Sequence, residues 1–300
     1  MGKPNARARF GWQGIEIDVP RSWELSRHGG TRAAGYAVLD DGAQLRLQVR
    51  WEAAMGARPD LGASVERYRR SLDRRAKVPL LFEAQDPDFL PKRLREGADV
   101  APFYWTGEQA AHGMAWHCHA CHRLVLVEAL FPCSEVDHTQ ARQILGSVQD
   151  HRADRKCLWS VYGFAFLAPD SYDLDETEFV PGRVRFGLRE SREAWLRVER
   201  WGVASQWLRK APLDQWPAEL LKLMRVSPVG EIEQRVVEVN GHTGRGFVHR
   251  PALRRGLKGH DAAQHGVLWL CPEMDKVFVV IASGGHEGVC EAVAASIECA

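Results

Sequence analysis

Short stretches of the chain alternate apolar and polar residues, and this two-residue period is typical of half-buried β-strands. In residues 15–19, and again in residues 45–51, every second side chain is apolar. A spacing of three to four residues follows twice, in segments that begin at Ser64 and at Asp137, the two expected N-caps. The pattern predicts antiparallel sheets covered by helices, which is the α+β class.

The second half of the chain shows the same succession of patterns. Apolar residues at helical spacing occupy residues 216–224 and, near the end, residues 289–297. Between them, the strand pattern of residues 236–239 stops at Asn240 and Gly241, a pair favoured in two-residue hairpin turns. Each half is therefore expected to contain a sheet with one helix before its central strands and one helix after them.

Two sequence motifs relate the halves directly. Residues 112–118 (HGMAWHC) and 265–271 (HGVLWLC) are identical at the His, Gly, Trp and Cys positions. Each motif precedes a short polar linker, a basic residue, an apolar run and an alanine. We interpret residues 1–150 and 156–300 as two tandem copies of one domain. The charged segment 150–156 would be the linker between them.

A second pair of motifs opens the copies and carries a resemblance to a known superfamily. Pro-x-x-Trp/Tyr-x-Leu occurs at residues 20–25 and 169–174, and each copy also has a Gly-x-x-Trp strand and a closing helix that ends in a Ser-aliphatic step. This order resembles the Mog1/PsbP-like superfamily, in particular its bacterial branch of unknown function. The resemblance implies an α/β/α sandwich in each copy and a binding function, and it carries over no catalytic residue.

Composition and charge narrow the class of protein. The chain is 45% hydrophobic and 26% charged, with a formal net charge of +1, so it has material for a core and no overall field that would attract nucleic acid. Its longest apolar run, residues 277–282, is far shorter than a membrane span. Seven cysteines without a secretory signal indicate reduced thiols, and hence a cytoplasmic protein.

The stretch CHACH contains half of a zinc site and also matches the attachment motif of covalent haem. Cys118 and Cys121 would flank a hairpin turn, where two thiolates can converge on one zinc ion. His119 and His122 would be further ligands, with His117 and His138 as alternatives. Cys118 matches Cys271 in the other copy whereas Cys121 matches a methionine, so buried packing residues are the favoured interpretation and no cofactor is expected. Zinc is the alternative, and the cytoplasmic expectation argues against haem.

Aromatic and basic residues supply the candidates for a binding surface. Three tryptophans that have no counterpart in the other copy are expected on such a surface, namely Trp12, Trp105 and Trp207. The segment 247–260 is locally basic and either holds an anionic group or is a solvated loop, the favoured interpretation. Its candidate cations are Arg250, Arg254, Arg255 and Lys258.

Three functions remain open on the sequence. The leading hypothesis is a non-enzymatic binding module, an adaptor or chaperone that receives a segment of a protein partner. The first alternative is a metal-binding or redox-responsive protein that uses the hairpin of Cys118 and Cys121. The second is an enzyme with a site between the two copies. That site would need titratable groups to converge, for example His112, His265, Glu128 and Asp275.

Overall fold

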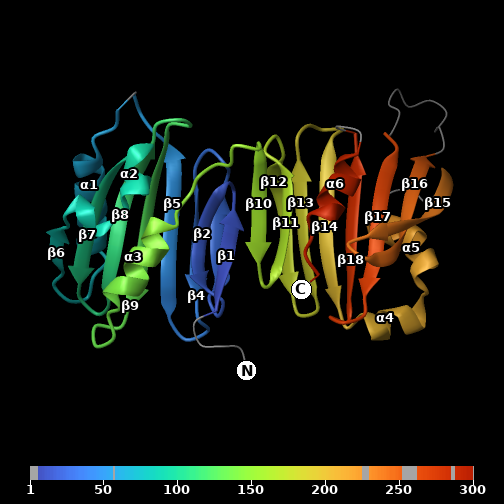
Figure 1. The fold of residues 1–300 in the computed structure, drawn as a ribbon, viewed down its shortest axis with the longest axis horizontal. Helices are drawn as coiled ribbons and strands as arrows, with labels where there is room; N and C mark the ends of the chain where they lie inside the picture. The colour runs from blue at the N-terminus through green and yellow to red at the C-terminus, as the bar shows by residue number, and fades with distance from the viewer. Residues whose placement is uncertain (1–5, 57, 225–229, 252–261, 285–287, 300) are drawn as a thin grey trace. The chain divides into compact units, whose positions relative to one another are not determined.

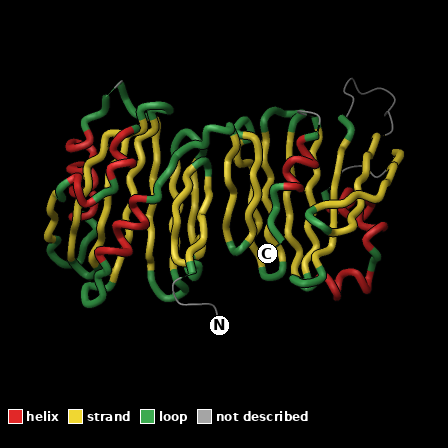
Figure 2. Tube along the Cα trace, viewed as in Figure 1, coloured by secondary structure: helices red, strands yellow, loops and turns green. Residues whose placement is uncertain are grey.

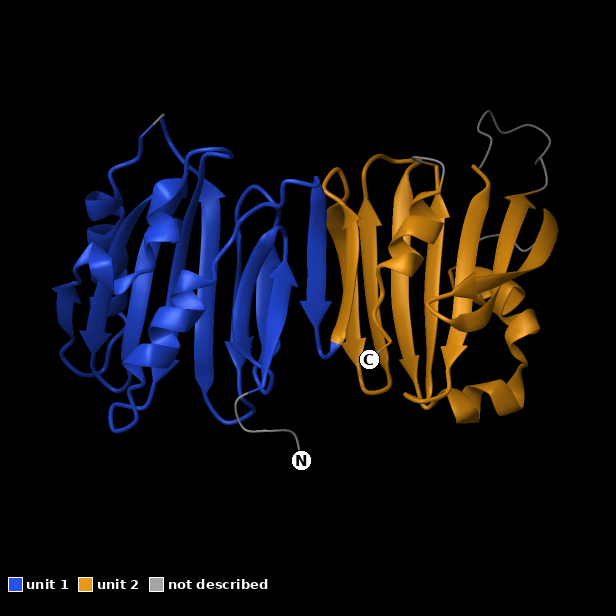
Figure 3. Ribbon diagram, in the orientation of Figure 1, with its two compact units in different colours: residues 1–163 blue, residues 164–300 orange. Residues whose placement is uncertain are grey.

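The structure is a computed structural model that describes residues 6–56, 58–224, 230–251, 262–284 and 288–299. The chain forms two compact units, residues 1–163 and 164–300, which Figure 3 shows in different colours. Within the described ranges there are 18 strands and six α-helices (Figures 1 and 2).

A seven-stranded antiparallel sheet forms most of the first unit. In spatial order its strands are β3 (Glu24–Gly30), β4 (Gly35–Asp40), β5 (Leu45–Ala53), β9 (Arg123–Phe131), β8 (Ala110–Cys118), β7 (Ala98–Thr106) and β6 (Leu81–Ala84). The central strands β8 and β9 are buried along nearly their whole length, so they lie at the centre of the core.

The second unit contains another seven-stranded antiparallel sheet. Its strands are β12 (Asp173–Val180), β13 (Arg183–Arg189), β14 (Trp195–Gly202), β18 (Lys276–Ser283), β17 (Gln264–Cys271), β16 (His242–Pro251) and β15 (Gly230–Val239). The strand order is the same as in the first sheet: β12 corresponds to β3 at one edge, and β15 corresponds to β6 at the other.

A third, smaller sheet contains the first strands of the chain. In the first unit, β1 (Arg7–Trp12) pairs with β2 (Ile15–Pro20) on one side and with β10 (Lys156–Val161) on the other. The next strand, β11 (Phe164–Pro169), begins the second unit. The first copy was predicted to end at residue 150, whereas the first unit extends to Gly163, because β10 pairs with β1.

The helices of the described residues are short. They are α1 (Leu61–Asp73), α2 (Lys92–Glu96), α3 (His138–Gly146), α4 (Ala204–Lys210), α5 (Trp216–Leu223) and α6 (Val289–Ala295), with 3₁₀ helices η1 (Pro87–Phe89) and η2 (Leu213–Gln215). As predicted, Asp137 caps α3, since its carboxylate accepts from the amide of Gln140 at 2.8 Å. The prediction that Ser64 caps the first helix is wrong. Asp60 caps it, and its carboxylate accepts from the amide of Ala63 at 2.9 Å.

The α/β/α sandwich expected for each copy is also wrong, because the chain is mostly antiparallel β. The longest helix in the described ranges, α1, has 13 residues. In the first unit, α1 contacts chiefly β7 and β8, and α3 contacts chiefly β2, β8 and β9. The small sheet covers part of the β3 side instead, where the ring of Trp12 lies 4.6 Å from that of His28. Strand β1, which carries Trp12, thus contacts the large sheet on this side. The alternation at residues 15–19 has the same period whichever sheet the strand joins, so the sequence did not reveal this.

Several local predictions are confirmed. Residues 15–19 and 45–51 lie in β2 and β5. Asn240 and Gly241 both have positive φ, 52° and 78°, as a tight turn between antiparallel strands β15 and β16 requires. In the part of the chain that the structure describes, no helix combines the length and the apolar character needed to cross a membrane.

Candidate metal centre

The turn between β8 and β9 brings two cysteines together. Cys118 is the last residue of β8, and Cys121 lies three residues on, in the turn. The turn closes through the amide of His122, which donates to the carbonyl oxygen of Cys118 at 3.0 Å. His122 has φ of 55°, a left-handed conformation that reverses the chain. Local backbone geometry therefore holds both sulfur atoms on one side of the hairpin.

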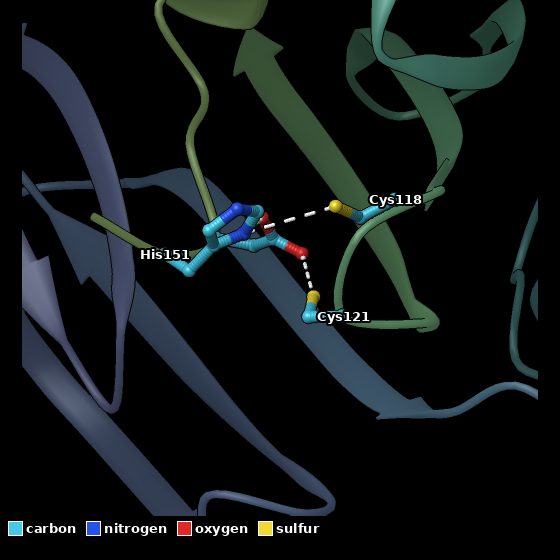
Figure 4. A group of neighbouring side chains, drawn as sticks. Cys118, Cys121 and His151 are labelled. Carbon is cyan, nitrogen blue, oxygen red and sulfur yellow. Dashed lines mark hydrogen bonds and ion pairs between the residues drawn. The ribbon is translucent and has the colours of Figure 1, made fainter. Parts of the chain in front are cut away.

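Two residues from a distant segment, Asp150 and His151, complete the cluster. Figure 4 shows His151 beside Cys118 and Cys121. The Oδ2 atom of Asp150 lies 2.7 Å from the Sγ atom of Cys121, and the Nδ1 atom of His151 lies 3.7 Å from the Sγ atom of Cys118. The other carboxylate oxygen of Asp150 lies 2.6 Å from Nδ1 of His151. One ligand atom from each of the four residues lies within 4.8 Å of all the others.

The segment after α3 is fixed by backbone pairing, which explains why Asp150 lies at the hairpin. Gln149 and Glu16 exchange both backbone hydrogen bonds, at 2.8 and 3.0 Å. The buried guanidinium of Arg123 donates to the carbonyl oxygens of Asp150 and Gln13, at 3.3 and 3.2 Å. Asp150 itself is only 3% exposed. Its buried carboxylate thus lies against the thiol of Cys121 and the imidazole of His151.

The two thiols have different acidities. The pKa of Cys118 is lowered to about 6, chiefly because the Cys121 thiol donates a hydrogen bond to it, and backbone amides in the turn act in the same direction. The pKa of Cys121 is raised, because its proton is held in that hydrogen bond, and because burial and the carboxylate of Asp150 disfavour a second negative charge. Cys118 therefore loses its proton more easily than Cys121, and the deprotonated thiolate is the form that ligates metals.

The donor set fits a zinc ion. Structural zinc sites take four ligands from cysteine, histidine and carboxylate side chains in tetrahedral geometry, and this cluster supplies four such side chains. Calcium and magnesium prefer all-oxygen ligand sets, which this cluster is not. Cys118, Asp150 and His151 also line a cavity of about 640 Å³, which gives an ion a route to the ligands.

The structure separates the four residues that the sequence proposed as metal ligands. Cys118 and Cys121 share the cluster, whereas His119 and His122 do not belong to it. The Nε2 atom of His119 lies 3.1 Å from the carboxylate of Asp99, and the ring of His122 lies 5.8 Å from that of His117.

His117 and His138, the alternative ligands, also lie elsewhere. The side chain of His117 alternates with that of Cys118 along β8 and so points to the other face of the sheet, where it forms a separate group with Asp99 and His119. His138 bonds through Nδ1 to Nε2 of His112 at 2.8 Å.

Sequence reasoning missed Asp150 and His151 because they lie in the stretch interpreted as a linker. A carboxylate and an imidazole are both metal-ligand side chains, so their residue types alone could have marked them as candidates. They follow Cys121 by about thirty residues, however, and only the pairing of Gln149 with Glu16 shows that this segment returns to the hairpin.

Two of the three tryptophans expected on a surface are buried. Trp12 is 1% exposed and packs edge-on against Trp159 in the core of the first unit. Trp105 is 7% exposed, and its indole N–H donates to the carboxylate of Glu128 at 2.7 Å. Both were expected at the surface because they lack a repeat counterpart, yet both lie in the core of the first unit. Trp207 is 42% exposed, and its role in binding stays a prediction.

The basic candidates are only partly covered by the structure. Arg250 is exposed and forms an ion pair with Glu233 at 2.6 Å, across β16 and β15. Arg254, Arg255 and Lys258 lie outside the described residues.

The titratable groups named for an enzymatic site have separate environments. His112 packs among His138, Phe89 and Tyr104. Glu128 is buried on the opposite face of the same sheet, where the hydroxyl of Tyr68 and the indole of Trp105 donate to it. In the second unit, Asp275 accepts from the backbone amide and hydroxyl of Ser205 at the start of α4. His265 is exposed on β17.

Comparisons with known proteins do not place the chain in a family. No protein-family model and no curated protein matches it. The chain is similar to the apo structure of the immunity protein TplEi of the T6SS from Pseudomonas aeruginosa, with 11% identity, coverage of 99% of this chain and 97% of that one, and a TM-score of 0.39. For the same protein complexed with "L" peptide, the identity is 12%, the coverages are 99% and 98%, and the TM-score is 0.36. At these TM-scores the similarity supports no argument about fold or function. The resemblance to the Mog1/PsbP-like superfamily stays a prediction.

Proposed function

We propose that the first unit binds a zinc ion through Cys118, Cys121, Asp150 and His151. The observation that carries this proposal is the convergence of four ligand atoms from two segments, each within 4.8 Å of the others. A site with four protein ligands leaves no open position for a substrate, so the proposed role is structural or metal-responsive and not catalytic. The ligands must be reduced thiols, which fits a cytoplasmic location, and that location is part of the proposal.

The bound ion would connect two parts of the first unit. Cys118 and Cys121 belong to the β8–β9 turn, whereas Asp150 and His151 follow α3. Coordination would tie the end of the closing helix to the hairpin over which it packs. It would also neutralise the buried carboxylate of Asp150. The bound ion would thus add a second attachment to a segment that backbone pairing with Glu16 already holds.

Zinc content of purified variants tests the proposal. The reduced full chain is equilibrated with zinc and freed of excess, and metal per chain is measured by mass spectrometry. Cys121→Ser and His151→Ala are each expected to hold one zinc fewer than the parent. His122→Asn is the matched control, because it changes a histidine of the same turn and asparagine tolerates the left-handed conformation. A loss in His122→Asn with none in His151→Ala would contradict this ligand set.

We also propose that the second unit binds a segment of a protein partner, because one face of its sheet is hollowed. A cavity of about 770 Å³ lies over β15–β18 beside α6. Its lining includes Glu233 of β15, Val248 of β16, His265 of β17 and Cys290 of α6. This size is within the range of ligand-binding clefts.

The first unit suggests what fits this cavity. His112 and Tyr104 pair across β8 and β7 as His265 and Val248 pair across β17 and β16. In the first unit, a segment of its own chain covers this position, and the ring of Phe89 stacks on that of His112 at 4.9 Å between centroids. In the second unit, β15 and β16 join through a two-residue turn, so no corresponding segment exists between them. The proposed ligand is a peptide segment with an aromatic side chain over His265.

A peptide with the sequence of residues 86–96 (DPDFLPKRLRE) is the probe for this second proposal. Added to the full chain labelled for NMR, it is expected to shift resonances of β16, β17 and α6 around His265. The same peptide with Phe89→Ala is the control and is expected to bind more weakly. Shifts that are equal for both peptides, or that fall outside this cavity, would overturn the proposal.

A further inference from the structure

A second group of soft ligands lies in the second unit. Cys271 is the last residue of β17, Cys299 follows α6, and His242 is the first residue of β16. The two sulfur atoms and one imidazole nitrogen lie within 4.8 Å of one another. None of these three residues takes part in the cluster of the first unit or in the hollowed face of β15–β18.

This group occupies the place that corresponds to the first cluster. Strand β17 has the position in its sheet that β8 has in the other, so Cys271 corresponds to Cys118. The segments after α3 and α6 are anchored in the same way. The hydroxyl of Ser147 accepts from a backbone amide of β2 at 2.8 Å, and the hydroxyl of Ser296 accepts from one of β11 at 2.9 Å. Asp150 and Cys299 each follow three residues after that serine.

The surroundings suit metal-binding thiolates. Cys271 is 1% exposed, and the carboxylate of Glu273 accepts from its thiol at 3.4 Å. The indole N–H of Trp269 donates to the sulfur of Cys299 at 3.5 Å, the kind of second-shell hydrogen bond that orients a metal ligand. Two cysteines and a histidine select zinc over calcium or magnesium.

We infer that the second unit binds its own zinc ion through His242, Cys271 and Cys299. Glu273 or a water molecule takes the fourth position of the tetrahedron. This inference goes beyond the proposed site of the first unit, because it rests on different residues in a different unit. The chain thus carries one thiolate-ligated ion per unit, each between the end of a central strand and the segment after the closing helix.

Metal content in a set of variants tests the inference. The full chain is kept reduced, equilibrated with zinc and desalted, and zinc per chain is measured by mass spectrometry. Cys299→Ser is expected to hold one ion fewer than the parent, and Cys121→Ser with Cys299→Ser two fewer. Cys133→Ser is the matched control, since Cys133 is an exposed cysteine outside both groups. It is expected to keep the full content.

Cobalt(II) provides a second readout that does not depend on counting zinc. Thiolate ligands give cobalt a near-ultraviolet charge-transfer band, and this band is expected in Cys121→Ser and absent from the double variant. His242→Gln tests the third ligand without altering a cysteine and is expected to weaken zinc binding at least tenfold. Far-ultraviolet circular dichroism checks that each variant is folded.

The outcomes separate this inference from the proposed function. If Cys299→Ser and His242→Gln retain the zinc of the parent while Cys121→Ser loses one ion, the inference is overturned and the site of the first unit stands. If Cys299→Ser loses one ion while Cys121→Ser loses none, the inference stands and the first site fails. Retention of the parent's zinc by all these variants overturns both.

Discussion

At the scale of single residues, His112 makes the stability of the chain depend on pH. Burial, and the electrostatic effect of the neighbouring His138, lower the pKa of His112 to about 4. Its ring also packs against Tyr104 and Phe89 and bonds to the side-chain amide oxygen of Gln85. In the unfolded chain the pKa of a histidine is about 6.5. Below that pH the unfolded state binds a proton that the folded state does not, so stability falls as the pH drops from about 6.5 towards 4.

We expect the titration of His112 to lower the unfolding free energy by on the order of 3 kcal/mol as the pH falls from 7 to 4. His112→Gln removes the titrating group, so its stability is expected to fall less over that interval. His265→Gln is the control, because His265 occupies the matching strand position and is exposed. Urea unfolding at a series of pH values measures both effects. Equal pH dependence in the parent and in His112→Gln would contradict the assignment.

Glu128 is a second residue whose replacement is expected to lower the stability of the protein. It is fully buried, burial raises its pKa, and its carboxyl group accepts from Tyr68 and Trp105. Glu128→Ala leaves both donors buried without an acceptor, so we expect a loss of about 3 kcal/mol in the unfolding free energy. Glu128→Gln keeps an acceptor and is expected to lose less. Thermal or urea unfolding compares the two variants, and an equally small loss in both would show that the donors find other partners.

At the scale of elements, the cap of α1 is a direct test of where that helix begins. Asp60→Ala removes the side-chain acceptor for the amide of Ala63 and is expected to lower the unfolding free energy by about 1 kcal/mol. Ser64→Ala is the control, because Ser64 lies inside the helix and its hydroxyl only donates to the carbonyl of Asp60 at 3.0 Å. Urea unfolding at neutral pH measures both. A larger loss for Ser64→Ala would restore Ser64 as the cap.

The elements also show how far the sequence predicts this fold. The alternation around Leu47 and the cap at Asp137 are local signals, and the structure confirms both. Asp60 was missed because the apolar spacing was first recognised four residues later. The pairing of β1 with β10, which makes the small sheet, joins residues about 150 positions apart and leaves no trace in a local period.

In the candidate site, too, the local features could be predicted from the sequence and the long-range contacts could not. Cys118 and Cys121 are recognisable because their spacing is local, whereas Asp150 and His151 reach them only through the fold. His119 and His122 were proposed because they are adjacent in sequence. In a strand and its turn, however, neighbouring side chains point in different directions. Short spacing therefore identified the thiols but not their partners.

At the scale of the whole molecule, the two large sheets share one strand order, and each has a thiol-containing group at the same place. Ligands that bind only the folded state stabilise it, by about 2.7 kcal/mol when their concentration is a hundred times the dissociation constant. Zinc is therefore expected to raise the unfolding temperature of the reduced chain, and a chelator to reverse the effect. In the double variant Cys121→Ser, Cys299→Ser, calorimetry is expected to show no zinc-dependent shift. An unchanged shift there would place the stabilising metal elsewhere.

The most direct test of the account is the zinc X-ray absorption spectrum of the Cys299→Ser variant loaded with one equivalent of zinc. With the second unit's group disabled, the spectrum reports the ligands of the first site. We predict about two sulfur ligands at roughly 2.3 Å and about two nitrogen or oxygen ligands at roughly 2.0–2.2 Å. A shell of nitrogen and oxygen alone would contradict zinc binding by Cys118 and Cys121.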